Sequence, residues 1–328
     1  MIRDSLVHRS LSRRLSCLAA ATLMTSAADA WPQVWGLQVS TPGWDSIDAL
    51  ASDGSGGTIE VGALNGQFGF VNSTLYAARR DPSGALVWQK QWGTSAGDHW
   101  YDAVADGSGG CFVAGVHIGN LFGPSQGGYD GVVVRLDPSG NVVWSDQVGT
   151  SESDYALAVS PDGAGGLYVV GTTPGNLAAT NLGGNDVWAA RYDSTGNRQW
   201  TIQFGSSGQE GVGCAEVDGS GVLFGGSTNG DLGNPMGQYD IFYGRIDSAG
   251  NLLWIRQFGT TGDDTLHDIA VPVVRRMQGL VEKLLKILRV TRRRCPGPEF
   301  VLVARHGRVS EKPTFSRKRC SPVRRRGL

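Results

Sequence analysis

A fourteen-residue segment recurs at nearly even spacing along the chain. Its copies read DPSGALVWQKQWGT, DPSGNVVWSDQVGT, DSTGNRQWTIQFGS and DSAGNLLWIRQFGT. They begin at Asp81, Asp137, Asp193 and Asp247. A shortened copy, WGLQVST, begins at Trp35, and the tryptophans of the five copies lie 53, 56, 56 and 54 residues apart. A fixed period of this size is typical of repeat architectures. The chain is therefore expected to fold as several copies of one supersecondary unit.

Each repeat has the pattern of four short strands joined by turns. In the third repeat we expect strands at 155–160, 167–172, 186–192 and 197–204, because these runs are rich in Val, Tyr, Trp and Phe and lie between Asp, Gly and Ser. The turn between the first two strands starts with an Asp that can accept its own turn's N–H groups, followed by Gly, which adopts positive φ at no cost. Its four copies start at Asp53, Asp106, Asp162 and Asp218.

Repeated four-stranded antiparallel units predict an all-β fold, a β-propeller in which each blade stacks on its neighbours. The expected domain is 31–271, with repeats at 35–88, 89–144, 145–200 and 201–254 and a partial fifth at 255–271. After Val271 the pattern stops before its second strand, whereas the segment around Trp35 matches an isolated fourth strand. We therefore expect an incomplete or truncated propeller.

Three residue types recur at fixed places around the repeated turn, and we expect them to be structural. The Trp is the expected wedge between blades, the Asp seven residues before it in all four copies of the turn is a turn former, and the Gln three residues after it is a hydrogen-bonding residue on the opposite face of the strand. These residues are Trp88, Trp144, Trp200, Trp254, Asp81, Asp137, Asp193, Asp247, Gln91, Gln147, Gln203 and Gln257.

The order of these motifs resembles a known repeat family. QFGT, DGSGG, a Gly-Asn-Leu loop (119–121 and 175–177), Tyr-Asp before the third strand and DPSGNxxW together are similar to the bacterial SBBP-type, seven-bladed β-propeller repeat, over residues 35–271. The resemblance implies an extracytoplasmic propeller and no common reaction. The D-x-S-G-x-x-x-W element is also similar to the tryptophan-docking motif of pyrroloquinoline-quinone dehydrogenase propellers, which joins blades and does not bind the cofactor.

The N-terminal thirty residues have the order of a secretory signal. Four Arg precede an apolar run at 15–24, which is followed by Ala28-Asp29-Ala30. Cleavage is expected after Ala30, by either the Sec or the twin-arginine route, and the mature protein is expected to be secreted, periplasmic or at the cell surface. The apolar run is too short to span a bilayer, which needs about 20 residues.

The C-terminal segment 272–328 has a different composition. Residues 31–271 contain 8 Lys and Arg against 25 Asp and Glu, a net charge of −17, whereas 272–328 contain 17 basic and 3 acidic residues, a net charge of +14. Residues 277–289 have helical spacing, and the remainder is expected to be helical or disordered. A genuine basic tail would indicate nucleic acid or anionic lipid as a partner. Because the change occurs within a repeat, we favour a shifted reading frame.

One carboxylate opens the first strand of every repeat. If these strands line the central channel, the five carboxylates form a ring that could bind a cation such as Ca²⁺; alternatively, each bonds the loop of its own blade. They are Asp45, Asp98, Asp154, Glu210 and Asp264.

The sequence offers little support for catalysis. His99, His117 and His267 occupy three different repeat positions, and none has an evident nucleophile as partner. Trp100 and Tyr101 could stack on a sugar or a peptide side chain, or lie in the core.

We therefore expect an exported, non-catalytic scaffold or binding module for an unknown protein or carbohydrate at the cell surface, with no cofactor. The alternatives are a quinoprotein- or lyase-like enzyme with its site over the channel, and a truncated fragment without independent function. Because an enzyme needs non-repeated polar residues at one mouth, and this chain's irregularities are scattered along the sequence, the scaffold is the preferred interpretation.

Overall fold

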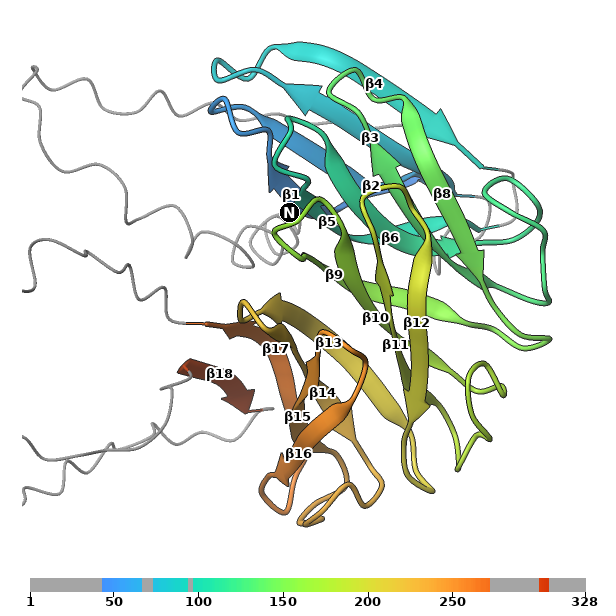
Figure 1. Cartoon of the computed structure of the whole chain (residues 1–328), viewed down its shortest axis with the longest axis vertical. Coiled ribbons are helices and arrows are strands. Elements are labelled where there is room, and N and C mark those ends of the chain that lie inside the picture. The colour runs from blue at the N-terminus through green and yellow to red at the C-terminus, as the bar shows by residue number, and fades with distance from the viewer. Residues whose placement is uncertain (1–42, 67–72, 94–96, 272–300, 307–328) are drawn as a thin grey trace, which may run out of the picture.

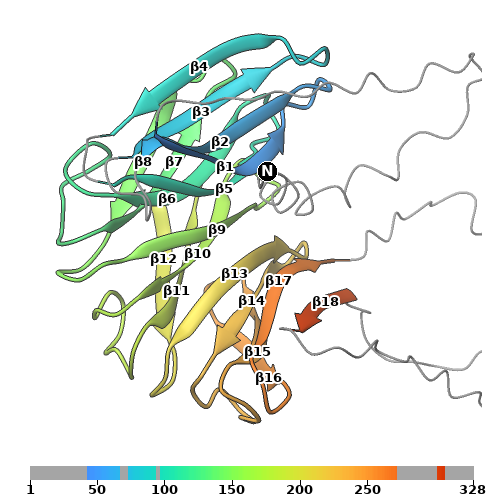
Figure 2. The ribbon, with the colours of Figure 1, turned by 180° about the vertical axis from the view of Figure 1, so that it is seen from behind.

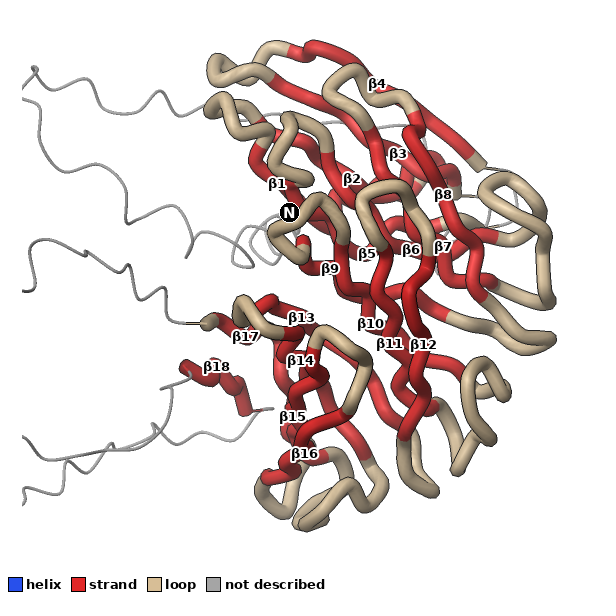
Figure 3. The backbone as a smooth tube through the Cα atoms, in the orientation of Figure 1, coloured by secondary structure: helices blue, strands red, loops and turns tan. Residues whose placement is uncertain are grey.

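A computed structural model describes residues 43–66, 73–93, 97–271 and 301–306, and within them the chain forms strands and loops only (Figure 3). Sixteen strands form four antiparallel four-stranded sheets, each in the order of its sequence. The first sheet contains β1 (Trp44–Ser52), β2 (Thr58–Gly66), β3 (Thr74–Arg80) and β4 (Leu86–Trp92). The second contains β5 (His99–Ala105), β6 (Cys111–His117), β7 (Asp130–Leu136) and β8 (Val142–Val148).

The third and fourth sheets repeat this arrangement. The third contains β9 (Tyr155–Pro161), β10 (Leu167–Thr173), β11 (Asp186–Tyr192) and β12 (Arg198–Phe204). The fourth contains β13 (Glu210–Val217), β14 (Gly221–Thr228), β15 (Asp240–Asp247) and β16 (Leu252–Phe258). The all-β, propeller-like prediction is confirmed, and in the third repeat the four strands differ from the expected ranges by one residue at most. In the part of the chain that the structure describes, no helix is long and apolar enough to cross a membrane.

The sheets follow one another as blades around an arc (Figures 1 and 2). The first strands β1, β5, β9 and β13 lie side by side on its inner side, and the fourth strands lie outside. The exposure of the sheets agrees with this arrangement, because second strands such as β6 and β10 are buried at every residue and fourth strands begin with two exposed ones. The axis of the arc is therefore lined by first strands.

The hydrophobic core lies between consecutive blades. One cluster joins Ile59 and Val61 of the first sheet to Trp100 and Val113 of the second, and equivalent clusters join the second to the third and the third to the fourth. Trp100 and Trp188 are both completely enclosed in these clusters. Because neither face of a blade is stable in water, each blade depends on its neighbours.

The turn between the first and second strands is capped by its own Asp, as predicted. The Asp53 carboxylate accepts the N–H groups of Ser55 and Gly57, both at 2.8 Å, and the corresponding Asp of the other three blades accepts from its own turn in the same way. Glycines of these turns have positive φ, 76° at Gly54 and 79° at Gly107. The sequence pattern therefore fixes the turn geometry locally.

A fifth unit begins with β17 (Asp264–Ala270), which pairs with β18 (Val301–His306). The prediction that the C-terminal segment is only helical or disordered is wrong at 301–306. The edge of β17 has backbone groups to satisfy, and the β-branched Val301 and Val303 favour an extended strand. The remainder of the segment, the expected helix at 277–289 and the signal at 1–30 lie outside the described residues.

The strand β18 occupies the place of a second strand in the same register as the other blades. In them a glycine pairs with the residue that lies two positions after the carboxylate opening the first strand: Gly62, Gly115, Gly171 or Gly226. A Cβ at any of the four would lie within 2.2 Å of a carbonyl oxygen of the first strand. In β18 this place is taken by Ala304, opposite Leu266.

Candidate functional site

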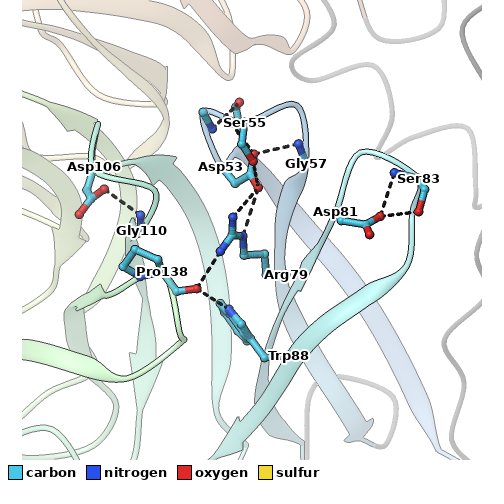
Figure 4. A network of polar contacts seen from close by, with 12 residues as sticks. Asp53, Ser55, Gly57, Arg79, Asp81, Ser83, Trp88, Asp106, Gly110 and Pro138 are labelled. Atoms are coloured by element: carbon cyan, nitrogen blue, oxygen red, sulfur yellow. Dashed lines mark hydrogen bonds and ion pairs between the residues drawn. The ribbon is translucent and has the colours of Figure 1, made fainter.

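The repeated Trp joins each blade to the next. The Trp88 indole N–H donates to the Pro138 carbonyl of the second blade's DPSG turn at 2.9 Å, as Trp200 does to Ser248 of the fourth blade at 3.1 Å (Figure 4). A Cβ on Gly140 would lie 2.8 Å from the Trp88 ring. Glycine is therefore required in this turn both for its positive φ of 77° and for the close approach of the indole.

An arginine forms the second part of the same joint. Arg79 bonds the capping Asp53 of its own blade at 3.0 Å and donates through Nη1 to the Pro138 carbonyl at 3.1 Å (Figure 4). Burial acts to raise the pKa of Asp53, but hydrogen bonds from Ser55, Arg79 and Gly57 outweigh it and lower the pKa to about 2. The carboxylate is therefore charged throughout the neutral range, and it holds the guanidinium in place.

This arginine was not predicted, although its signal is in the chain. An Arg stands two residues before the Asp of each repeated turn, and each bonds the capping Asp of its own blade: Arg79, Arg135, Arg191 and Arg245. The second blade departs from the pattern elsewhere. The Trp144 Nε1 has no hydrogen-bond partner among the described residues, and the ring stacks on Tyr192 at a centroid distance of 5.7 Å.

The repeated Gln holds the long loop before the third strand. Gln203 donates to the Gly175 carbonyl and to Asp186, both at 3.0 Å, while its oxygen accepts N–H groups of the loop, including that of Leu177 at 2.8 Å. Gln147 and Gln257 make the corresponding contacts to Asp130 and Asp240. These Gln side chains are buried at the end of the blade opposite to the turn between the third and fourth strands, on which the Trp of the preceding blade docks. For Gln91, the loop before the third strand of its blade includes residues 67–72, which lie outside the described residues.

The carboxylates that open the first strands bond within their own blades. Asp154 accepts from the Thr150 hydroxyl at 2.9 Å, Glu210 from Ser206 at 2.6 Å and Asp264 from Thr260 at 3.0 Å. Asp98 is also buried, and Asp45 is partly exposed. Within the described ranges no three His, Cys, Asp or Glu side chains gather so as to hold a metal ion. Asp154, Glu210 and Asp264 therefore bond residues of their own repeat, which is the contact that the alternative to a carboxylate ring expects.

Two of the histidines contact carboxylates that the sequence did not reveal. His117 is completely buried and its Nδ1 lies 2.7 Å from Asp98, while its Nε2 accepts the Leu121 N–H at 3.3 Å. Accepting through Nε2 leaves Nδ1 as the donor toward Asp98, so both ring nitrogens of His117 are used within its own blade and the side chain has a structural role. The His99 Nε2 lies 3.3 Å from Asp48, whose side chain is 29% exposed.

A hollow of about 340 Å³ lies among the first strands. Its lining includes Asp48 of β1, Tyr101 of β5, Leu157 of β9, Gly213 of β13 and His267 of β17. All five stand at the same place, three residues after the carboxylate that opens each repeat's first strand. Each of the five is the residue left unpaired where the register between the first and second strands shifts, as at a β-bulge, and such a bulge redirects one residue per blade toward this space.

The lining position differs from its neighbour along the strand. The residue just before it is apolar in every repeat and lies in or against the core: Ile47, Trp100, Ala156, Val212 and Leu266. The lining residue itself is an acid, a phenol, an aliphatic residue, a glycine or an imidazole. Packing therefore keeps this position apolar in all five repeats, although Val212 and Leu266 also reach the hollow, and leaves the adjacent lining position free to vary.

The polar residues that depart from the repeat pattern are not scattered in the folded chain, contrary to the expectation from the sequence. They are far apart in the sequence, but the fold brings Asp48, Tyr101 and His267 to one hollow. The five different residues at this fixed place in the repeat were the available signal, which only an assignment of the strand faces would have isolated. The alternatives for the aromatic pair are resolved residue by residue, since Trp100 lies in the core and Tyr101 at the hollow.

Comparisons with known proteins give limited similarity. No protein-family model matches the chain. A stretch of 167 residues is 26% identical to the regulatory protein FlaEY of Caulobacter vibrioides, covering 45% of this chain and only 18% of FlaEY. Among solved structures, a Synechocystis apocarotenoid oxygenase is 12% identical over 66% of this chain and 48% of its own, with a TM-score of 0.37. The α-L-arabinofuranosidase of Lactobacillus brevis is 10% identical over 65% of this chain and 71% of its own, also at 0.37. At TM-scores of 0.37 these structures support no inference about the function of this chain.

Proposed function

We propose that this chain is an exported β-propeller of the SBBP type that acts as a non-catalytic binding scaffold, with its ligand at the hollow among the first strands. The observation that supports this proposal is the contrast between repeated and non-repeated positions. Residues that hold the blades recur in every complete repeat, whereas the five lining residues differ, as expected where a common scaffold presents one specific surface.

The ligand can be sought with the purified full-length protein on glycan and peptide arrays. We expect a hit whose binding is lost in Tyr101→Ala, because this side chain lines the hollow from β5. The matched control is Val143→Ala, whose residue is 53% exposed on the outer strand β8. Binding that is equally strong in Tyr101→Ala, or no hit on either array, would contradict the proposal.

A second candidate function is an enzyme of the lyase kind with its site in the hollow. The observation in its favour is the meeting of Asp48, Tyr101 and His267, which are groups able to exchange protons. Incubation with acidic polysaccharides, followed by the ultraviolet absorbance of unsaturated products, tests it. Turnover that is lost in His267→Ala would support the enzyme, and absence of turnover with retained binding would support the scaffold. A bound quinone in the absorption spectrum would instead support a quinoprotein.

Export and the length of the natural product are tested by one measurement. The intact mass of the protein secreted from its own host should correspond to a chain that starts at Trp31. Peptides that continue the repeat past Val271 would support a shifted reading frame, and a mass ending at Leu328 would make the basic segment part of the protein. Retention inside the cell with residues 1–30 attached would contradict export.

A further inference from the structure

The hollow exists because one first strand has no side chains on its inner face. Gly211 and Gly213 of β13 both line it, where the other blades have residues such as Tyr155 and Tyr101 at the same places. A Cβ added at Gly211 would meet no atom closer than the Ser227 carbonyl oxygen, at 3.7 Å, whereas a Cβ at Gly213 would lie 2.6 Å from the Leu266 carbonyl oxygen of β17. The space is therefore open above Gly211, and at Gly213 the neighbouring strand approaches closely. Its volume of about 340 Å³ is at the small end of ligand sites, and suits a side-chain-sized group.

The walls of the hollow carry negative charge and hydroxyl groups. Asp48 contributes a carboxylate, Tyr101, Ser227 and Thr265 contribute hydroxyls, and His267 contributes an imidazole. No Lys or Arg is among the lining residues that the structure describes. The Asp48 Oδ2 accepts from the Ser46 hydroxyl at 2.8 Å and lies 3.3 Å from His99, so its position is fixed from the side of its own blade and the next.

The environment of Tyr101 keeps its hydroxyl protonated. Burial is the largest cause that raises the pKa of this phenol, and Tyr155, Asp48 and Tyr129 raise it further. Of these neighbours only Asp48 is a carboxylate, and a carboxylate at this place favours a cation. The ring of Tyr101 stands 4.7 Å from the His99 ring in an edge-on arrangement, which fixes the aromatic wall.

We propose that this hollow binds a cationic group, an ammonium or a guanidinium, with Asp48 as its counter-ion and Tyr101 as its aromatic wall. A carboxylate and an aromatic face are the two elements that recognise such cations. Residues 31–271 have a net charge of −17 and residues 272–328 a net charge of +14, so the attraction in the full-length protein is expected to come from Asp48 at the hollow and not from the charge of the whole chain. The inference rests on the proposed binding function and specifies its ligand class.

Calorimetric titration of the full-length protein tests the inference, with arginine amide and spermidine as cationic probes, a neutral trisaccharide and the dianion succinate. We expect the cationic probes to bind, and we expect added salt to weaken their binding. Asp48→Asn should weaken them about tenfold or more, since a charge-assisted contact of this kind contributes on the order of one factor of ten.

The matched control is Asp146→Asn. Asp146 has a side chain 27% exposed, against 29% for Asp48, and it also faces a single basic partner, Arg198 at 3.3 Å. It lies on the outer strand β8, so its change should leave binding intact. Should Asp48→Asn lose its fold, Leu157→Lys provides a second variant, because a lysine on β9 would place a competing cation in the hollow.

The outcomes separate this inference from the function it rests on. Cationic probes that bind wild type and Asp146→Asn, and fail in Asp48→Asn or Leu157→Lys, support it. Binding of the trisaccharide alone, lost in Tyr101→Ala, would overturn the cationic ligand and retain the binding scaffold. If the cationic probes bind equally to all variants, or if succinate binds in the hollow, the inference is wrong. If no probe binds, the cationic ligand is rejected, and the arrays decide the fate of the scaffold.

Discussion

The joint between blades depends on a glycine, and its replacement gives the sharpest test of the fold. Gly140 has a φ of 77°, and a Cβ at this position would lie 2.8 Å from the Trp88 ring. Gly163 has the same φ of 77°, but a Cβ there would meet no atom within 4 Å. Replacing either glycine by alanine therefore has the same backbone cost, and only the replacement at Gly140 also disturbs the docking of the Trp88 indole.

The magnitude follows from these two contributions. Gly163→Ala should cost about 1–2 kcal/mol, the penalty for a left-handed residue with a Cβ. Gly140→Ala should cost the same and a further amount of about 1–3 kcal/mol, because the Trp88 ring must move from its contact and its bond to Pro138. We expect the midpoint of urea unfolding, followed by circular dichroism, to fall in both variants and to fall further in Gly140→Ala.

A double-mutant cycle isolates the contact. In a Trp88→Ala background the ring is absent, so Gly140→Ala should then cost no more than Gly163→Ala. Equal costs for the two glycine variants in the wild-type background would refute the docking of Trp88 on the turn. A full cost of Gly140→Ala that persists without Trp88 would assign it to the backbone instead.

Three further predictions concern stability. The pKa of Asp53 is lowered to about 2, so the contribution of this carboxylate to the free energy of unfolding is present above about pH 4 and is lost as the pH falls from there to about 2. Arg79→Gln should therefore raise the midpoint pH of acid unfolding, and an unchanged midpoint would contradict the role of the arginine. Burial, and after it the charge of a neighbouring carboxylate, raises the pKa of Tyr76 to about 12, so the contribution of this phenol to the free energy of unfolding is present below about pH 10 and falls as the pH rises to about 12. The difference in tyrosinate absorbance between wild type and Tyr76→Phe should therefore show no ionisation near pH 10 while the fold persists. Gly171→Ala, whose Cβ would lie 1.8 Å from the Tyr155 carbonyl oxygen, should cost about 3 kcal/mol or more, and a loss no larger than that of Gly163→Ala would show that β9 and β10 can separate freely.

The strands and turns followed from local signals in the chain. The Asp-Gly turns specify their own geometry through side-chain oxygens and positive φ, as at Asp53 and Gly54. The apolar runs between the turns predicted the strands. The role of Trp88 between blades followed from its recurrence, but its partner, the Pro138 carbonyl, lies 50 residues away. The strand at 301–306 was not predicted, because it forms only against the edge of β17.

The candidate site was decided almost entirely by tertiary structure. By itself the sequence determined the repeat, the four strands of each blade and the residues that must be the same in every copy, because those features rest on contacts a few residues apart or on one contact made many times. The hollow depends on which face of each first strand meets the axis, and on Asp48 and His267 coming together across more than 200 residues. No local preference encodes that meeting; it results from stacking blade upon blade, where packing restricts one face of each first strand and leaves the other free to differ.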